Sequence, residues 1–265
     1  MPESLSEVPD TDKDSLPAMG FLEHLEELRR RIIYSLIAVA VGFCACWRYA
    51  ENIYEIMQRP IMTALQHHGM SEKLVYLDPT EPFNIYLKVA ALAGLFLTSP
   101  FILYQVWAFI SPGLYRNEKR YVVPFMVSTV SLFLAGGYFG YKLVYPQALE
   151  FLIGFGKQFQ PMITIEKYTD LFLVIIIGMG AIFEMPILVF FLSLMGIVTA
   201  GWMWRNLRYS ILVIFIIAAI LTPTTDILNM CIFAAPMIGL YLFSIAIAWL
   251  VHPKQRRARL EKSAK

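Results

Sequence analysis

A carboxylic acid stands in the middle of a long apolar stretch of this 265-residue chain. Glu184 lies within residues 170–195, two positions before Pro186, which loosens the backbone there. An acid in the interior of a membrane is costly, so it is a functional candidate by default. We expect Glu184 to face a hollow side of the protein, protonated or bound to water. The alternative is an acid whose hydrogen bonds are satisfied within the bundle.

Other residue types that carry chemistry form no pattern typical of an enzyme. The cysteines (Cys44, Cys46 and Cys231) all fall in apolar stretches, where we expect them to be buried small hydrophobic residues. His67 and His68 are adjacent, but the sequence contains no HExxH or CxxC motif and no GxxxxGK[ST] phosphate loop. We therefore expect no catalytic activity, no cofactor and no metal site.

The elements that must position Glu184 are six apolar stretches, each a candidate for crossing a bilayer. A helix needs about 20 apolar residues to span a core of about 30 Å. The chain is 58% hydrophobic with a mean hydropathy of +0.58, well above the values typical of soluble domains. The predicted fold is an all-α integral membrane protein with six transmembrane helices at residues 31–50, 86–110, 122–143, 170–195, 208–222 and 228–251.

The distribution of basic residues predicts the orientation of the spans. Placing the N-terminus inside puts 15 of the 22 basic residues on the cytoplasmic side, which is the side that Lys and Arg favour. Both termini are then cytoplasmic. The net charge of +2 reflects this asymmetry and does not indicate nucleic-acid binding. The sequence has neither a signal peptide nor a transit peptide, which favours a bacterial inner membrane.

The chain divides into an acidic tail at 1–19, expected to be disordered, a transmembrane domain at 20–251, and a basic cytoplasmic tail at 252–265. Prolines within or beside the spans bend helices and suggest a curved bundle with a hollow side; they are Pro100, Pro124, Pro186 and Pro236. The helical spacing of the segments between spans predicts a structured outer cap. The fifth span, about 15 residues, is some 8 Å shorter than a typical core.

Several motifs lie in a recognisable order along the chain. FLEHLEELRRR begins at Phe21, YQVWAFI at Tyr104, PGLY at Pro112, EKR at Glu118 and FEMP at Phe183. Together with Thr222-Pro223 and Asp226, they resemble the TatC family, the multi-spanning receptor subunit of the twin-arginine protein translocase. The resemblance covers residues 20–250. It implies export of folded proteins driven by proton-motive force, with TatA-like and TatB-like single-span partners in an oligomeric complex.

The resemblance implies that Glu27 and Glu118 bind the paired arginines of signal peptides. Two adjacent guanidinium groups call for carboxylates, ideally in bidentate contact. Glu27 lies on the amphipathic N-terminal helix and Glu118 in the loop between spans 2 and 3, both at the cytoplasmic surface. The alternatives are an exposed i,i+4 pair of Glu27 with Arg31 and a solvated loop acid at Glu118. Glu26 points about 100° away from Glu27 on the helix.

Three further residues match positions in the same motifs. Arg29 and Arg120 either position the acids or bind anionic lipid, or simply set the topology. Phe109 ends the aromatic motif at the cytoplasmic surface, where it either joins the signal-peptide site or is an interfacial aromatic residue.

The resemblance also assigns roles away from the peptide site. It implies that Glu184 acts in translocation or contacts a polar group of a partner. Asp226, in the outer turn between spans 5 and 6, is either a partner contact or a turn-capping residue. Pro60 matches a proline of the first outer loop, and bending that loop would be a sufficient structural reason for it.

A proton-coupled secondary transporter of a small solute, with Glu184 as proton carrier, is the alternative function. The acids at the cytoplasmic surface argue against it, because a solute carrier has no use for them. An intramembrane enzyme would need further acids or a Ser-His or metal set within the spans.

Overall fold

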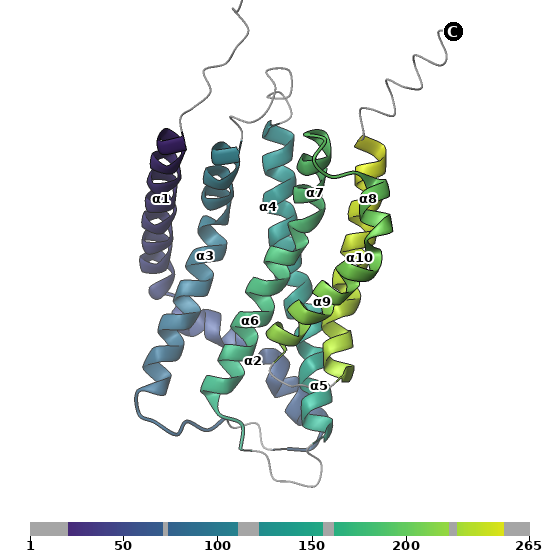
Figure 1. Ribbon diagram of the computed structural model, residues 1–265. Helices are drawn as coiled ribbons and strands as arrows, with labels where there is room; N and C mark the ends of the chain where they lie inside the picture. The colour runs from purple at the N-terminus through teal and green to yellow at the C-terminus, as the bar shows by residue number, and fades with distance from the viewer. Residues whose placement is uncertain (1–20, 71–73, 111–121, 156–161, 223–226, 252–265) are drawn as a thin grey trace, which may run out of the picture.

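Helices account for nearly all of the described structure of this computed structural model, which covers residues 21–70, 74–110, 122–155, 162–222 and 227–251 (Figure 1). Both predicted tails, 1–19 and 252–265, lie outside these residues. An isolated bridge joins Val75 and Thr164. The elements are α1 (Phe21–Trp47), α2 (Ala50–His67), α3 (Glu81–Ile110), α4 (Val122–Phe139), the π-helix η3 (Gly140–Val144), α5 (Tyr145–Phe155), α6 (Ile165–Phe183), α7 (Met185–Leu194), α8 (Ala200–Arg205), α9 (Leu207–Leu221) and α10 (Ile227–Val251).

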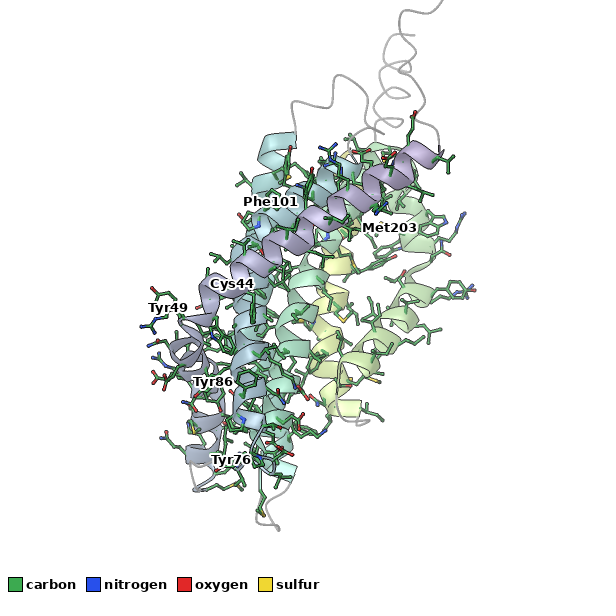
Figure 2. The ribbon with its side chains drawn as sticks, turned by 90° about the vertical axis from the view of Figure 1, so that its left-hand side faces the viewer. Cys44, Tyr49, Tyr76, Tyr86, Phe101 and Met203 are labelled. Carbon is green, nitrogen blue, oxygen red and sulfur yellow. The ribbon has the colours of Figure 1, made fainter. Side chains whose placement is uncertain are left out.

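The start of α1 and the end of α10 lie at the same end of the molecule (Figure 1). We call this the inner end, following the predicted orientation, and the opposite end, which carries α2 and α5, the outer end. In the side view, Phe101 and Met203 lie toward the inner end, whereas Tyr76 lies at the outer end (Figure 2).

Four helical stretches are long and apolar enough to cross a membrane: 22–47, 81–109, 165–194 and 227–250. The third combines α6 and α7. The structure therefore confirms the predicted all-α class. The α4 helix has 18 residues and continues through η3 into α5, while α9 has only 15 residues. The six-span count and the orientation remain predictions.

The helices form an open row and not a closed ring in Figure 1. At one edge α1 packs on α3, and at the other α10 packs on α7 and α9, with α4 and α6 between them. The edge helix α1 is the least buried of the four long apolar stretches: 6% of its most apolar window is buried, against 50% of that of α6 and α7. Such a row is consistent with the predicted curved wall.

Glycines let α1 approach α3 closely. A Cβ atom added to Gly94 would lie 2.6 Å from the backbone nitrogen of Phe43, and one on Gly42 would lie 2.8 Å from the Gly94 carbonyl oxygen. Small residues at such crossings are typical of membrane helices, because association there depends on close packing.

The cysteine expectation was wrong for two residues. Cys44 and Cys231 are exposed on the surface of the chain, and Cys46 is half-buried; Cys44 lies on α1 (Figure 2). In a membrane protein an apolar side chain does not need a protein neighbour to avoid water, because lipid tails are equally apolar. An apolar stretch therefore does not reveal which of its residues are buried in protein.

Bent helices keep their backbone groups satisfied in ways that the local sequence explains. Pro100 has no N–H to donate to the carbonyl of Phe96, and the Ser99 hydroxyl donates to that oxygen instead, at 2.8 Å. Pro146 follows η3, where the Tyr145 N–H reaches back to the Gly140 carbonyl, so the π-helical turn absorbs the irregularity before the proline.

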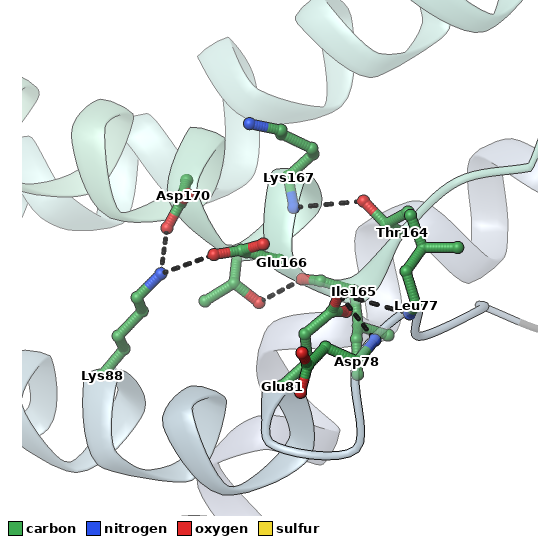
Figure 3. A network of polar contacts seen from close by, with 10 residues as sticks. Leu77, Asp78, Glu81, Lys88, Thr164, Ile165, Glu166, Lys167 and Asp170 are labelled. Atoms are coloured by element: carbon green, nitrogen blue, oxygen red, sulfur yellow. Dashed lines mark hydrogen bonds and ion pairs between the residues drawn. The ribbon is translucent and has the colours of Figure 1, made fainter.

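A polar network ties the outer end together (Figure 3). The Lys88 ammonium on α3 lies 2.6 Å from Asp170 and 3.9 Å from Glu166, both on α6. The Asp78 carboxylate accepts from the amide and hydroxyl of Thr80, which lowers the pKa of Asp78. With α2 and α5, this network forms the structured outer cap that the sequence predicts.

Candidate functional site

The first turns of α1 and the last turns of α3 meet at the inner end. The His24 ring stacks on the Phe109 ring, with centroids 4.3 Å apart and planes 15° apart. Further along α1, the Arg31 Nη1 group donates to Gln105 Oε1 at 3.1 Å. Glu27 lies on α1 between these two contacts, so they fix the helix segment that carries it.

Glu27 is held more tightly than an exposed helix pair would be. Its Oε1 atom accepts from Arg31 Nε at 2.9 Å and from Nη2 at 2.5 Å, and only 17% of its side chain is exposed. Its Oε2 atom is buried and has no hydrogen-bond partner among the described residues. A buried carboxylate oxygen without a donor is unfavourable and marks a place where a ligand or water donates.

A cavity of about 580 Å³ lies beside this carboxylate. Three glutamates and two arginines contribute to its wall, which gives one formal negative charge in excess. The lining residues are Glu23, Glu26, Glu27, Arg30, Arg31, Tyr34, Tyr104 and Gln105. We call this cavity and the adjacent His24–Phe109 stack the inner site. It has the shape and charge to accept a guanidinium group.

The structure places some predicted site residues together and not others. Glu27 and Phe109 belong to the inner site. Arg29 is exposed on α1 and is absent from the lining of the cavity. Glu118, Arg120 and Asp226 lie outside the described residues, so their predicted roles remain predictions.

Sequence reasoning missed several residues of the inner site. Glu26 lines the same cavity as Glu27 although their side chains diverge, because a cavity of this size spans more than one helix face. Gln105 is 7% exposed and bonds Arg31. A glutamine within the aromatic motif of a membrane helix is expensive unless paired, and that signal could have identified it.

Glu184 lies at the break between α6 and α7. Its carbonyl accepts from the amides of Ile187 and Leu188, and Pro186 occupies the first turn of α7. The side chain is half-buried, and Oε1 is buried without a hydrogen-bond partner in the described part of the chain. Thr129 lies on α4, which packs against α6. It is fully buried, and its hydroxyl also has no hydrogen-bond partner among the described residues.

Pro60 lies inside α2, and two tyrosine hydroxyls donate to backbone carbonyls in the turn that precedes it. The Tyr141 hydroxyl donates at 2.8 Å to the Ile56 carbonyl, the oxygen that the missing N–H of Pro60 leaves free. The Tyr168 hydroxyl donates to the next carbonyl, that of Met57. These contacts supply the structural reason for a proline at this position.

The family model described as Sec-independent protein translocase protein (TatC) matches residues 23–236. The chain belongs to the TatC family. It is 69% identical over 249 residues to the Sec-independent protein translocase protein TatC of Koribacter versatilis (strain Ellin345), covering 94% of this chain and 92% of that protein.

Solved structures agree with the TatC assignment. A crystal structure of the twin-arginine translocase receptor TatC superposes with a TM-score of 0.77 at 35% identity, over 86% of this chain and 99% of that one. The TatC protein of Aquifex aeolicus (strain VF5) is 35% identical over 241 residues. The predicted family is thus confirmed, and the TatC match includes Glu27, Phe109 and Glu184. The solute-transporter alternative is not favoured.

Proposed function

We propose that this TatC chain is the receptor that binds the twin-arginine signal peptides of folded export cargo, and that the inner site is where the arginines dock. The buried Oε2 atom of Glu27 is the observation that supports this most. It is an acceptor on an acid-lined cavity of about 580 Å³. The positively charged partner that it already has, Arg31, uses the other oxygen.

Recognition follows from guanidinium chemistry. A planar guanidinium donates two parallel hydrogen bonds to a carboxylate, and such contacts strengthen when water is partly excluded. One signal arginine would donate to Glu27, either at Oε2 or by displacing Arg31. The second would meet Glu118, which the sequence places in the loop that follows α3. Glu23 and Glu26 add negative potential at the entrance.

The remaining predicted residues support this site in the proposal. Phe109, stacked on His24, forms an apolar wall beside the carboxylates. Arg29, which is exposed, and Arg120 either orient the acids or bind anionic lipid headgroups.

Export itself is proposed to involve the part of the helix row that carries Glu184. The bound cargo would cross the bacterial inner membrane with TatA-like and TatB-like single-span partners, in an oligomeric complex driven by proton-motive force. The unpaired oxygen of Glu184, at the α6–α7 break, supports a role there. Asp226 is proposed as a partner contact at the outer end. Both termini are proposed to be cytoplasmic, and no catalytic step or cofactor is assigned to this chain.

A direct binding measurement tests the receptor assignment. The purified protein in detergent would be titrated with a fluorescent twin-arginine signal peptide, with the paired-lysine peptide as a reference. Truncating one side of a desolvated charged contact typically costs about 2 kcal/mol or more. Glu27→Gln should therefore weaken binding of the arginine peptide by about 30-fold or more, and adding Glu118→Gln should abolish it.

A matched control comes from the other end of the molecule. Glu55→Gln alters an exposed acid on α2 and should leave affinity unchanged. If the Glu27→Gln, Glu118→Gln double variant bound the peptide with wild-type affinity, these carboxylates would not be the groups that bind the signal arginines.

A further inference from the structure

A second cavity, of about 550 Å³, lies at the outer end of the molecule, at the opposite end from the inner site. Apolar side chains of α2, α5, α6 and α9 line most of it, among them Ile61, Leu149, Val174 and Leu221. We call it the outer pocket. Its volume falls within the roughly 300–1,000 Å³ range of small-ligand sites.

The outer pocket exists because α9 is short. A helix of 15 residues is about 22 Å long, whereas the hydrocarbon core is about 30 Å thick. The last residues of α9, Ile220 and Leu221, line the pocket from one side, and residues of α5 in the outer cap line it from another. The predicted membrane placement of α9 then puts hydrocarbon beside the space between the end of α9 and the cap.

One cation stands at this pocket with no partner in the described structure. Lys167 contributes to the lining and makes no ion pair among the described residues. One acid, Asp170, also lines the pocket, and the Lys88 ammonium neutralises it at 2.6 Å. An anionic group at the entrance would therefore meet Lys167 without strong repulsion from Asp170.

We propose that the outer pocket binds one anionic phospholipid, with an acyl chain in the apolar interior and the headgroup phosphate on Lys167. A lysine ammonium is a common partner of phosphate, and an apolar cavity of this kind favours hydrocarbon over water. The lipid would complete the wall where α9 stops, which offsets the mismatch between a short helix and the bilayer.

Other occupants fit less well. An extended peptide would bring backbone N–H and C=O groups into a mostly apolar wall, where they would lack partners. A partner's transmembrane helix is about 10 Å in diameter with its side chains, so a span of it would exceed a cavity of about 550 Å³.

Lipid retention measures the headgroup contact. The full chain would be purified, and its bound phosphatidylglycerol and phosphatidylethanolamine would be counted by native mass spectrometry. A lysine near an anionic lipid surface contributes about 1 kcal/mol. Lys167→Gln should therefore retain phosphatidylglycerol about fivefold less well and phosphatidylethanolamine unchanged. Lys142→Gln, an exposed lysine outside the pocket, should behave as wild type.

Photolabelling tests the interior of the pocket. A phosphatidylglycerol with a diazirine near the end of one acyl chain should label Leu171 or Ile153 preferentially. Val174→Phe fills the pocket and should abolish this label, whereas Val213→Phe, an exposed position on α9 outside the pocket, should not. Equal labelling of the two variants, or label spread evenly over the apolar surface, would overturn the proposal. The proposal would also be overturned if Val174→Phe left lipid binding unchanged but abolished crosslinks between the chain and a signal peptide or a partner helix.

Discussion

Glu27 and Glu184 each carry one buried oxygen that no described donor satisfies, yet their surroundings differ. Glu27 already shares its other oxygen with Arg31 and lies in a cavity with further charged groups, so it suits recognition of a cation. Glu184 stands at a helix break in an apolar setting, where a water or a single polar group of a partner would satisfy it. We expect the two acids to serve separate steps.

Substitution of Glu184 tests that separation. Glu184→Ala removes one buried polar interaction, which is typically worth about 1–3 kcal/mol. Transport of a folded reporter into the periplasm should fall by about 5- to 150-fold, while affinity for the signal peptide stays within about twofold. The transport rate is measured in inverted membrane vesicles, and the affinity is measured by titration with the signal peptide. Parallel loss of both, accompanied by a lower Tm, would instead assign Glu184 to the fold.

At the residue scale, the sequence predicted where unusual side chains lie and offered the local pair of Glu27 with Arg31, but it did not predict the contacts between helices. Glu184 was identifiable because an acid in an apolar stretch is expensive. The stacking of His24 on Phe109 and the Arg31–Gln105 bond join residues far apart in sequence, and no local pattern encodes such contacts.

At the scale of elements, the proline within α2 is accommodated by a side chain from another helix. The Tyr141 hydroxyl takes the place of the amide that Pro60 lacks. This exchange makes the proline tolerable and also ties α2 to η3, so this part of α2 and the outer cap stabilise each other.

A double-mutant cycle measures this coupling. Tyr141→Phe removes the donor to the Ile56 carbonyl and should destabilise the protein by about 0.5–1.5 kcal/mol, or a few degrees in Tm. In a Pro60→Ala background the backbone amide of residue 60 can pair with Ile56, so the same substitution should cost much less. Thermal unfolding in detergent gives all four values. Additive effects would show that the hydroxyl and the proline act independently.

Element boundaries were only partly predictable. Apolar length indicated where helices run, and the missing amide at Pro60 follows from ring chemistry. The run of α4 through η3 into α5 was not foreseen, because a π-helical turn has no clear sequence signal. The break at Glu184 depends on Pro186 at the start of α7, and a proline within a span does not indicate whether the helix bends or restarts.

At the scale of the whole molecule, the orientation decides whether the inner site faces the signal peptides. The charge distribution predicts that the start of α1 and the loop after α3 are cytoplasmic. Cysteine labelling in intact cells tests this, in a chain whose Cys44, Cys46 and Cys231 have been replaced by serine. Lys119→Cys should resist an impermeant maleimide until the cells are lysed, while Arg59→Cys on α2 should label at once. The reverse pattern would place the carboxylates of the inner site outside the cell.

The overall architecture was more accessible from the sequence than the site. Mean hydropathy and ordered motifs were sufficient for the all-α class and the TatC family, both now confirmed. The shape of the inner site could not be predicted from the sequence, because it arises from how α1 and α3 cross.

The crossing of α1 and α3 bears on how a signal peptide docks and what happens next. Gly42 and Gly94 bring two backbones into van der Waals contact, and both helices of this pair carry inner-site residues. Because this crossing holds α1 against α3, we expect a leader that docks at the inner site to lose little entropy in shaping its receptor. Whatever rearrangement follows docking should therefore start at the interrupted helix beside Glu184, and a cargo-bound but transport-arrested complex should be a long-lived, isolable species.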